Sequence, residues 1–208
     1  MAEERFVGPE HTLDDLGRSM WGVHHMLAST PRPTADDLEG RLALIEAESA
    51  AREVLTRYTY FYDGKNLDGL MGVFHDDCKL VNPRGTYEGI EAIRENYGFL
   101  MGLFKMVFHY APNVMVRVLD DRRSAWLASY LFSIGVVEGQ GLHNGNCSSY
   151  VARVVLDDGV WKIREMRITT NVPMEMQPRD SVMAPSASPP DPTTDVSSAD
   201  WVGPEWKA

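Results

Sequence analysis

Apolar positions recur about every 3.6 residues through the first half of the chain, a period that predicts helices. The longest such run extends from Leu38 to Tyr58 and predicts a single helix. Thr34 is expected to cap its start, with Asp36 and Asp37 in the first turn, where negative charge is favourable. Gly64 is expected to end the helix, because glycine commonly terminates helices.

Two shorter helices are expected further along the chain. Leu67–Phe74 follows Asn66, a suitable N-cap, and Ile90–Phe104 follows the connection Thr86–Gly89. Cys78–Val81, between the two, begins a strand.

From Val107 onward, the period of the apolar pattern shortens to about 2, which is typical of strands. Turn signals occur at Asp120–Arg123 and at Asp157–Gly159. Three helices followed by antiparallel strands predict an α+β fold, with the helices packed on a strongly curved, mostly antiparallel sheet. The expected strands are Val114–Val118, Ala125–Val137, Ser148–Leu156 and Val160–Thr170.

The two ends of the chain differ from this central region. Residues 1–35 are expected to form an extension with a short helix ending at Leu27, residues 36–173 the domain, and residues 174–208 a tail rich in Pro, Ser and Asp. The tail nevertheless carries Trp201 and Trp206. Because each tryptophan can bury a large apolar area, we expect at least one end to pack on the domain or across an oligomer interface.

Composition narrows the classes of partner. The 208 residues carry a formal net charge of −10, which disfavours nucleic acid and anionic membranes. There are two cysteines, no N-terminal signal pattern and no apolar run of the roughly 20 residues that span a bilayer. The chain is therefore expected to be cytoplasmic.

Candidate chemistry lies at two points in the pattern. The long helix is apolar until it ends in Tyr58, Tyr62 and Asp63, so these groups either cap the helix or point into a cavity. His109 lies at the start of the strand region, where alternation turns it away from its aromatic neighbours. A lone histidine of this kind is more often a core residue than a catalyst, so its pairing with another group decides its role.

Five motifs occur in the order found in one superfamily: the Tyr62–Asp63 helix end, Phe74–Asp77, Tyr87–Ile93, His109–Asn113 and the Gly159–Ile163 hairpin. Over residues 40–172, the chain resembles the SnoaL-like branch of the NTF2-like superfamily. The resemblance implies a cone formed by a curved sheet and helices, with a hollow between them.

Within that superfamily, the chain is most similar to the cofactor-free lyases: scytalone dehydratase, bile acid 7α-dehydratase, hexachlorocyclohexane dehydrochlorinase and the formaldehyde lyases of lignin dimers. This resemblance implies that Asp63 orients His109, which removes a proton. Tyr58 matches the tyrosine of the bile acid enzyme and Tyr62 the Tyr–Asp pair of scytalone dehydratase, so either phenol could be the acid. The implied function is elimination of water or formaldehyde from a bulky hydrophobic or aromatic, hydroxylated molecule, in aromatic compound catabolism.

The third polar group of such a site stays open at this stage. Arg153, Arg164 and Arg167 are alternatives, and His143 or Asn146 could supply a second histidine or an asparagine. Substrate contacts are expected from Phe104, Met106, Asn113, Trp126, Tyr130, His143, Asn146 and Arg167.

Two other classes of function remain open: an isomerase or cyclase with the same site, and a non-catalytic module for hydrophobic ligands or assembly. Contact between Asp63 and His109 would favour an enzyme. No dinucleotide, P-loop or H-E-x-x-H motif occurs, so no cofactor and no metal are expected. A homo-oligomer, most simply a dimer, is expected from the apolar alternation of Val114, Val116 and Val118.

Overall fold

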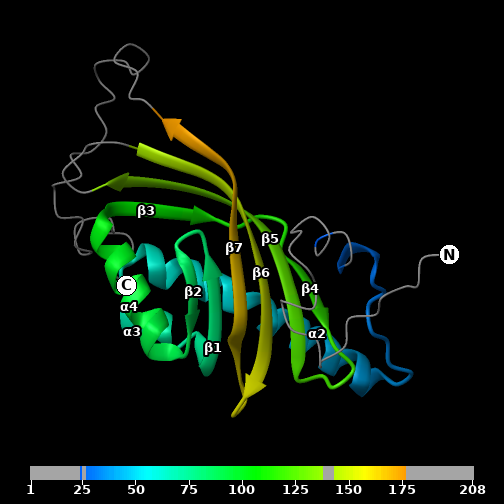
Figure 1. The fold of residues 1–208 in the computed structure, drawn as a ribbon. Coiled ribbons are helices and arrows are strands. Elements are labelled where there is room, and N and C mark those ends of the chain that lie inside the picture. Colours follow the sequence, from blue (N-terminus) through cyan, green and yellow to red (C-terminus); the bar gives the residue numbers. More distant parts are fainter. Residues whose placement is uncertain (1–23, 25–26, 138–142, 177–208) are drawn as a thin grey trace, which may run out of the picture. The chain divides into compact units, whose positions relative to one another are not determined.

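The computed structural model describes residues 24, 27–137 and 143–176 (Figure 1). Within these residues, a seven-stranded sheet runs in the order β2-β1-β7-β6-β5-β3, and β4 also pairs with β5. The strands are β1 (Phe74–Asn82), β2 (Gly85–Glu88), β3 (Phe104–Tyr110), β4 (Met115–Val118), β5 (Ser124–Val137), β6 (His143–Asp157) and β7 (Val160–Met176). The helices with described bounds are α2 (Leu38–Asp63), α3 (Leu67–Met71) and α4 (Ile90–Leu103), and residues 27–29 are also helical.

Helix α2 is the long helix that the sequence predicts, with a corrected cap. Asp37, rather than Thr34, is the N-cap, and its carboxylate accepts a hydrogen bond of 2.6 Å from the backbone N–H of Gly40. The helix ends at Gly64, which keeps an ordinary φ of −76°. The left-handed conformation falls one residue later, at Lys65 with φ 53°.

The second helix is shorter than expected. Asn66 caps α3 as predicted, since its side chain accepts from the backbone N–H of Gly69 at 2.8 Å. Phe74, however, belongs to strand β1 and not to the helix. Thr86 lies in β2, which forms a hairpin with β1, so the expected connection into α4 is itself a strand.

The sheet is mostly antiparallel, as predicted, and it curves over the helices (Figure 1). Among the described strands, β1 and β7 are the parallel pair. β7 pairs with β6 as far as Met176, six residues beyond the predicted end at Thr170. The fold is therefore α+β, with helices packed on an open, curved sheet.

Alternation along β5 separates two apolar clusters on opposite faces of the sheet. Ala125, Leu127 and Leu131 face the helices and join the main core around α2. Trp126 and Ala128 face the other way and form a second cluster with Leu27, Leu119 and Val151. We call the first face the inner face and the second the outer face.

The valines of β4 lie on the inner face, which corrects the argument for an oligomer. Val116 and Val118 are buried in the main core, and Val114 packs against it. They cannot form an exposed patch, because α2 already covers them. Any interface must therefore use other residues.

The described part of the N-terminal segment packs on the outer face. Leu27 is fully buried there, and the guanidinium of Arg117 donates to the backbone carbonyl of Thr30 at 2.9 Å. The expected packing of a chain end is thus confirmed for these residues. Residues 1–23, 25–26, 138–142 and 177–208, the last range with Trp201 and Trp206, lie outside the described part.

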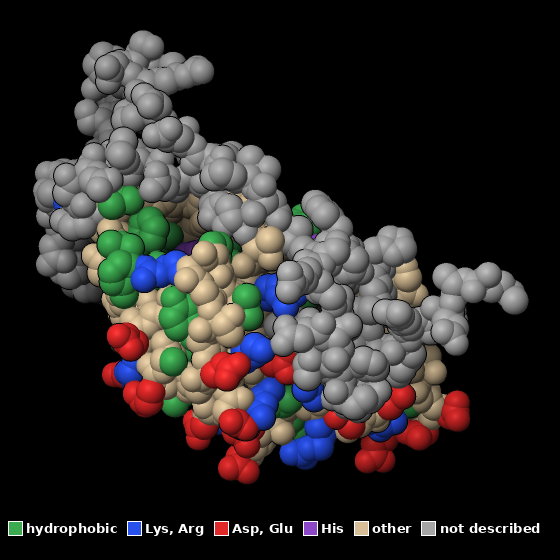
Figure 2. Space-filling model, viewed as in Figure 1, with side chains coloured by type: hydrophobic (Ala, Val, Ile, Leu, Met, Phe, Trp, Pro, Cys, Tyr) green, Lys and Arg blue, Asp and Glu red, His purple; other side chains and the backbone are tan. Residues whose placement is uncertain are grey.

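Acidic side chains, interspersed with Lys and Arg, gather along the lower edge of the face in Figure 2. None of the helices in the described part is long and apolar enough to span a membrane.

Candidate active site

Asp63 and His109 meet where the end of α2 reaches strand β3. One carboxylate oxygen of Asp63, Oδ1, lies 2.5 Å from Nδ1 of the His109 ring. The other, Oδ2, accepts a hydrogen bond of 2.8 Å from the backbone N–H of the same histidine. Both side chains are largely shielded from water, with exposed fractions of 18% for Asp63 and 11% for His109. The contact that the sequence left to be decided is therefore present.

The chain just after α2 makes a second contact with strand β3. Lys65 adopts the left-handed conformation just after α2 and donates from Nζ to the carbonyl of Phe104 at 2.5 Å, at the start of β3. The same helix end therefore contacts β3 at two places. Asp63 does not pair with Lys65, the arrangement that would have favoured a role confined to the helix terminus.

The hydrogen bond between Asp63 and Nδ1 determines which ring nitrogen of His109 is basic. An ionised carboxylate only accepts hydrogen bonds, so Nδ1 carries the proton in the neutral ring. Nε2 then has the lone pair that can remove a proton from a ligand. Since Asp63 also accepts from the backbone N–H of the same residue, both the ring and the main chain of His109 are held in place.

Tyr62 lies directly beside this pair. Its ring meets the imidazole of His109 edge to face, with 4.7 Å between centroids, and its side chain is buried. Burial raises the pKa of Tyr62 well above its usual value, and the charges of Tyr58 and Asp63 raise it further. Tyr62 therefore stays a neutral phenol, able to donate a hydrogen bond, throughout the physiological range.

Tyr58 belongs to a cluster of tyrosines behind Tyr62. Its hydroxyl lies 2.9 Å from that of Tyr97, and it also hydrogen-bonds to Tyr150. All three rings are buried. Burial raises the pKa of Tyr58 to about 12, although the two hydrogen bonds lower it in part.

Tyr97 and Tyr150 were not among the residues predicted from sequence. Tyr97 lies on α4 and Tyr150 on β6, and burial raises the pKa of each well above the usual value. The available sequence signal was a tyrosine at an apolar position in each element, a pattern that ordinary core residues share. Only the packing shows that their hydroxyls converge on Tyr58.

Strand register determines which residues lie beside His109 in the sheet. His109 pairs with Ser133 of β5, and Ser133 pairs with Asn146 of β6. Phe104, one of the predicted substrate contacts, packs against the main core, and an added Cβ on Gly135 would come within 2.7 Å of its ring. The side chains of Asn146 and His143 lie outside the described part.

Several other predicted substrate contacts lie on the outer face, which corrects their expected position. Trp126 is in the outer cluster, and Tyr130 shares its alternation. Met106 also lies on the outer face, because its neighbour Val107 on β3 is buried in the main core. Arg167 lies on the outer face as well, since it pairs with Val151 of the outer cluster.

Asn113 follows the end of β3 in a left-handed bend with φ 50°, so strand alternation does not carry it to the side of His109.

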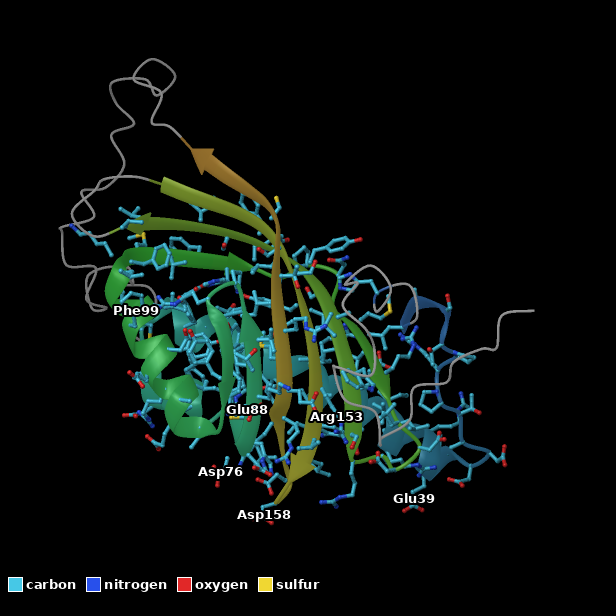
Figure 3. The ribbon with its side chains drawn as sticks, in the orientation of Figure 1. Glu39, Asp76, Glu88, Phe99, Arg153 and Asp158 are labelled. Carbon is cyan, nitrogen blue, oxygen red and sulfur yellow. The ribbon has the colours of Figure 1, made fainter. Side chains whose placement is uncertain are left out.

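The competing arginines are held away from the dyad. Arg164 donates to Asp77 at 2.6 Å and contacts Nδ1 of His75 at 2.9 Å. Arg153 pairs with Glu165 at 3.7 Å. In Figure 3, Arg153 lies toward the lower part of the sheet, far from Phe99 on α4. Neither arginine, as placed, supplies a third polar group next to His109.

A recess bordered by hydrophobic side chains opens on the face shown in Figure 2, and histidine surface is visible inside it. Within the described residues, no three His, Cys, Asp or Glu side chains are grouped as a metal site. The end of α2 and strand β3 bring together a histidine, a carboxylate and a phenol, which are groups able to accept or donate a proton.

Comparison with protein families agrees with this architecture. The model of the SnoaL-like domain matches residues 43–167, which is more than half of the chain. The chain belongs to the SnoaL-like domain family. In this SnoaL-like protein, the matched region begins within α2 and ends within β7, so it contains both members of the dyad.

Solved structures similar to this SnoaL-like protein share its NTF2-like fold. A candidate scytalone dehydratase from Novosphingobium aromaticivorans is 19% identical with a TM-score of 0.60, covering 66% of this chain and 92% of its own. A type-3 hexachlorocyclohexane dehydrochlorinase LinA from Novosphingobium barchaimii is 16% identical with a TM-score of 0.60, covering 65% and 93%. An NTF2-like superfamily protein from Salmonella enterica is 18% identical with a TM-score of 0.58, covering 62% and 93%.

At these identities the likeness establishes the fold, and the neighbours include dehydratase and dehydrochlorinase enzymes. No curated protein matches the sequence significantly.

Proposed function

We propose that this SnoaL-like protein is a cofactor-independent lyase that carries out an elimination on a bulky hydrophobic or aromatic molecule bearing hydroxyl groups. The observation that carries the proposal is the double contact of Asp63 with His109, through Nδ1 at 2.5 Å and through the backbone N–H at 2.8 Å. If Asp63 only capped its helix, it would not have to contact the His109 ring. If His109 is a general base, a carboxylate at Nδ1 is needed to fix its tautomer.

In the proposed reaction, Nε2 of His109 removes a proton from a C–H or O–H group of the substrate. The electron pair left behind forms a new double bond while the bond to the leaving group breaks. The imidazolium that results is stabilised by the Asp63 carboxylate. Loss of water requires that a proton reach the departing oxygen, and loss of formaldehyde requires proton transfer to the carbon left behind.

Tyr62 is the better candidate for the acid than Tyr58. The hydroxyl of Tyr58 is engaged with Tyr97 and Tyr150, so using it would break an existing network. The hydroxyl of Tyr62 has no hydrogen-bond partner within the described residues, and its ring touches that of His109. It can therefore donate to a leaving oxygen or to a developing oxyanion.

The names of the structural neighbours support an elimination, since a dehydratase and a dehydrochlorinase both remove a proton and expel a group. An isomerase or cyclase would use the same base and differ in its products. A screen of aromatic diols and hydroxylated aryl ethers should therefore identify whether water, formaldehyde or nothing is lost, by mass spectrometry of the products.

Proton removal can be tested without the natural substrate. Nitrobenzisoxazole is an uncharged aromatic molecule, and removal of its C–H proton by a base leads to N–O cleavage and a coloured cyano-nitrophenolate. We expect the purified protein to accelerate this opening, and His109→Ala to lower the rate by about 10²–10⁴-fold, the usual contribution of a general base.

His75→Ala is the matched control, because His75 is also on a strand but contacts Arg164 rather than a buried carboxylate. It should leave the rate unchanged. Equal rates for the wild type and both variants would contradict a basic His109 and favour the non-catalytic class.

A further inference from the structure

A second cavity lies on the outer face of the sheet, on the side opposite the dyad. Its volume is about 370 Å³. That size falls within the range of about 300–1,000 Å³ usual for small-molecule pockets. Seven residues from the N-terminal segment, the β3–β4 connection, β4 and β5 line it: His24, Ala28, Asn113, Met115, Ala128, Ser129 and Tyr130. We call it the outer pocket.

The N-terminal segment closes the outer pocket on one side. Leu27 is buried in the outer cluster and so anchors the segment to the sheet. His24, three residues earlier, meets the ring of Tyr130 edge to face, with 5.4 Å between centroids and 83° between planes. The imidazole of His24, from the N-terminal segment, and the phenol ring of Tyr130, from β5, thus form one aromatic wall of the pocket.

A polar wall comes from the connection after β3. Asn113 stands there in a left-handed conformation with φ 50°. The carbonyl of Pro112, next to it, accepts a hydrogen bond of 2.7 Å from the hydroxyl of Ser129. This contact ties the connection to β5 and holds the Asn113 amide at the edge of the cavity.

The outer pocket carries no formal charge. None of its lining residues is Asp, Glu, Lys or Arg, in a chain whose net charge is −10. Burial lowers the pKa of His24, and a hydrogen bond with the Tyr150 backbone offsets this only in part, so the ring is neutral at pH 7. An ion would gain no compensating charge here, so the walls favour a neutral molecule.

We propose that the outer pocket binds a small neutral aromatic alcohol, of the phenol or benzyl alcohol class. The ring of such a molecule would pack on Met115 and Ala128 and against Tyr130, where sulfur and aromatic contacts are favourable. Its hydroxyl would hydrogen-bond to the Asn113 amide. The site is separate from the proposed catalytic site, because strand alternation places Ala128 and Tyr130 on the face away from the main core.

Phenol is a direct probe of this proposal. In a titration followed by ¹H–¹⁵N NMR, the side-chain amide of Asn113 and the backbone amide of Ser129 should shift with saturation. Ala28→Phe should raise the dissociation constant by about ten-fold or more, because the new ring occupies the cavity. Ala28 is exposed, so this change leaves the core intact. Tyr130→Ala, which removes one wall, should weaken binding to a similar degree.

Tyr60→Ala provides the matched control, since Tyr60 is an exposed tyrosine on α2 that does not line the outer pocket. It should leave the dissociation constant unchanged, as should His109→Ala, which separates this site from the proposed catalysis. The proposal is overturned if phenol shifts neither Asn113 nor Ser129, or if Ala28→Phe and Tyr130→Ala bind phenol as tightly as Tyr60→Ala.

Discussion

At the scale of single residues, Asp63 determines what His109 can do. Its two oxygens reach the ring and the backbone of the same histidine, so one carboxylate sets both the tautomer and the position of the base. Two tyrosines that look equivalent in the sequence have different surroundings. Tyr58 is hydrogen-bonded within a buried cluster, whereas Tyr62 faces the histidine.

Asp63→Asn should separate orientation from proton removal. Asparagine can keep the backbone hydrogen bond but supplies no negative charge to stabilise the imidazolium, so opening of nitrobenzisoxazole should fall by about 10²-fold or more. Circular dichroism should show a folded protein. An unchanged rate would mean that His109 works without Asp63.

Substitution of the two phenols should give different phenotypes. Tyr62→Phe should lower turnover of the cognate substrate by about 10²-fold or more, the typical contribution of a general acid. Tyr58→Phe should mainly reduce stability, by about 1–3 kcal/mol, because it leaves buried hydroxyls of Tyr97 and Tyr150 without a partner. Steady-state kinetics measures the first effect and urea unfolding the second. If Tyr58→Phe lost turnover and Tyr62→Phe did not, Tyr58 would be the acid instead.

Alkaline pH should destabilise the folded chain through the same tyrosines. The pKa of Tyr58 is raised from 10.0 to about 12 by burial. Between these values, the unfolded chain has lost the proton and the folded chain still holds it, so the unfolded state binds fewer protons and stability falls as pH rises.

Urea unfolding from pH 9 to pH 12 checks this prediction, since the loss of stability should begin near the ordinary phenol pKa of 10.0. In Tyr58→Phe, the free energy of unfolding should fall less steeply as pH rises. An identical slope in the variant would show that Tyr58 does not carry the effect.

At the scale of elements, the end of α2 and the start of β3 form the unit that holds the site. Lys65 bonds to the Phe104 carbonyl at the beginning of that strand, and Asp63 bonds to His109 further along it. On the other side of the sheet, the N-terminal segment is held by Leu27 in the outer cluster.

Leu27→Ala should test whether that segment is part of the folded unit. The side chain is fully buried, and removing a buried leucine side chain typically costs about 2–5 kcal/mol. The free energy of unfolding, measured in urea, should therefore fall by that order. Leu38→Ala, at a position that is 80% exposed, is the control and should change stability little. Equal, small effects would place Leu27 outside the cooperative core.

At the scale of the whole molecule, a homo-oligomer stays a prediction, with a changed basis. The valines of β4 are covered by α2, but Phe108 and Tyr110 are 63% and 69% exposed. Both lie on β3, a strand at the edge of the sheet. They alternate with Val107, which is buried on the inner face, so their side chains lie on the outer face. Exposed aromatics grouped in this way favour association with a second copy of the chain.

The double variant Phe108→Lys and Tyr110→Lys should convert an oligomer into monomers, because charge replaces the apolar contact. Light scattering after size exclusion measures the mass of each form. A wild-type protein that is already monomeric at micromolar concentration would contradict the prediction.

The sequence alone determined the order of most elements, with β2 as an exception, and it picked out both members of the dyad. Periods of 3.6 and 2 follow from local backbone geometry, so α2 and most of the strands could be located, and Asp63 and His109 stood out as polar groups at element ends. Errors at Thr34 and Phe74 lie at element boundaries, where several residues compete to cap or to pair.

Only the tertiary structure decided which side chains share a face and which hydroxyls meet. A strand turns its side chains by half a revolution at each residue, so Trp126 and Tyr130 lie on the outer face and not beside the dyad, where their types had suggested substrate contacts. Tyr97 and Tyr150 come from elements far apart in sequence, and no local pattern reports that they converge on Tyr58. Contacts of that kind depend on register and on the curvature of the sheet, which are properties of the whole packed chain.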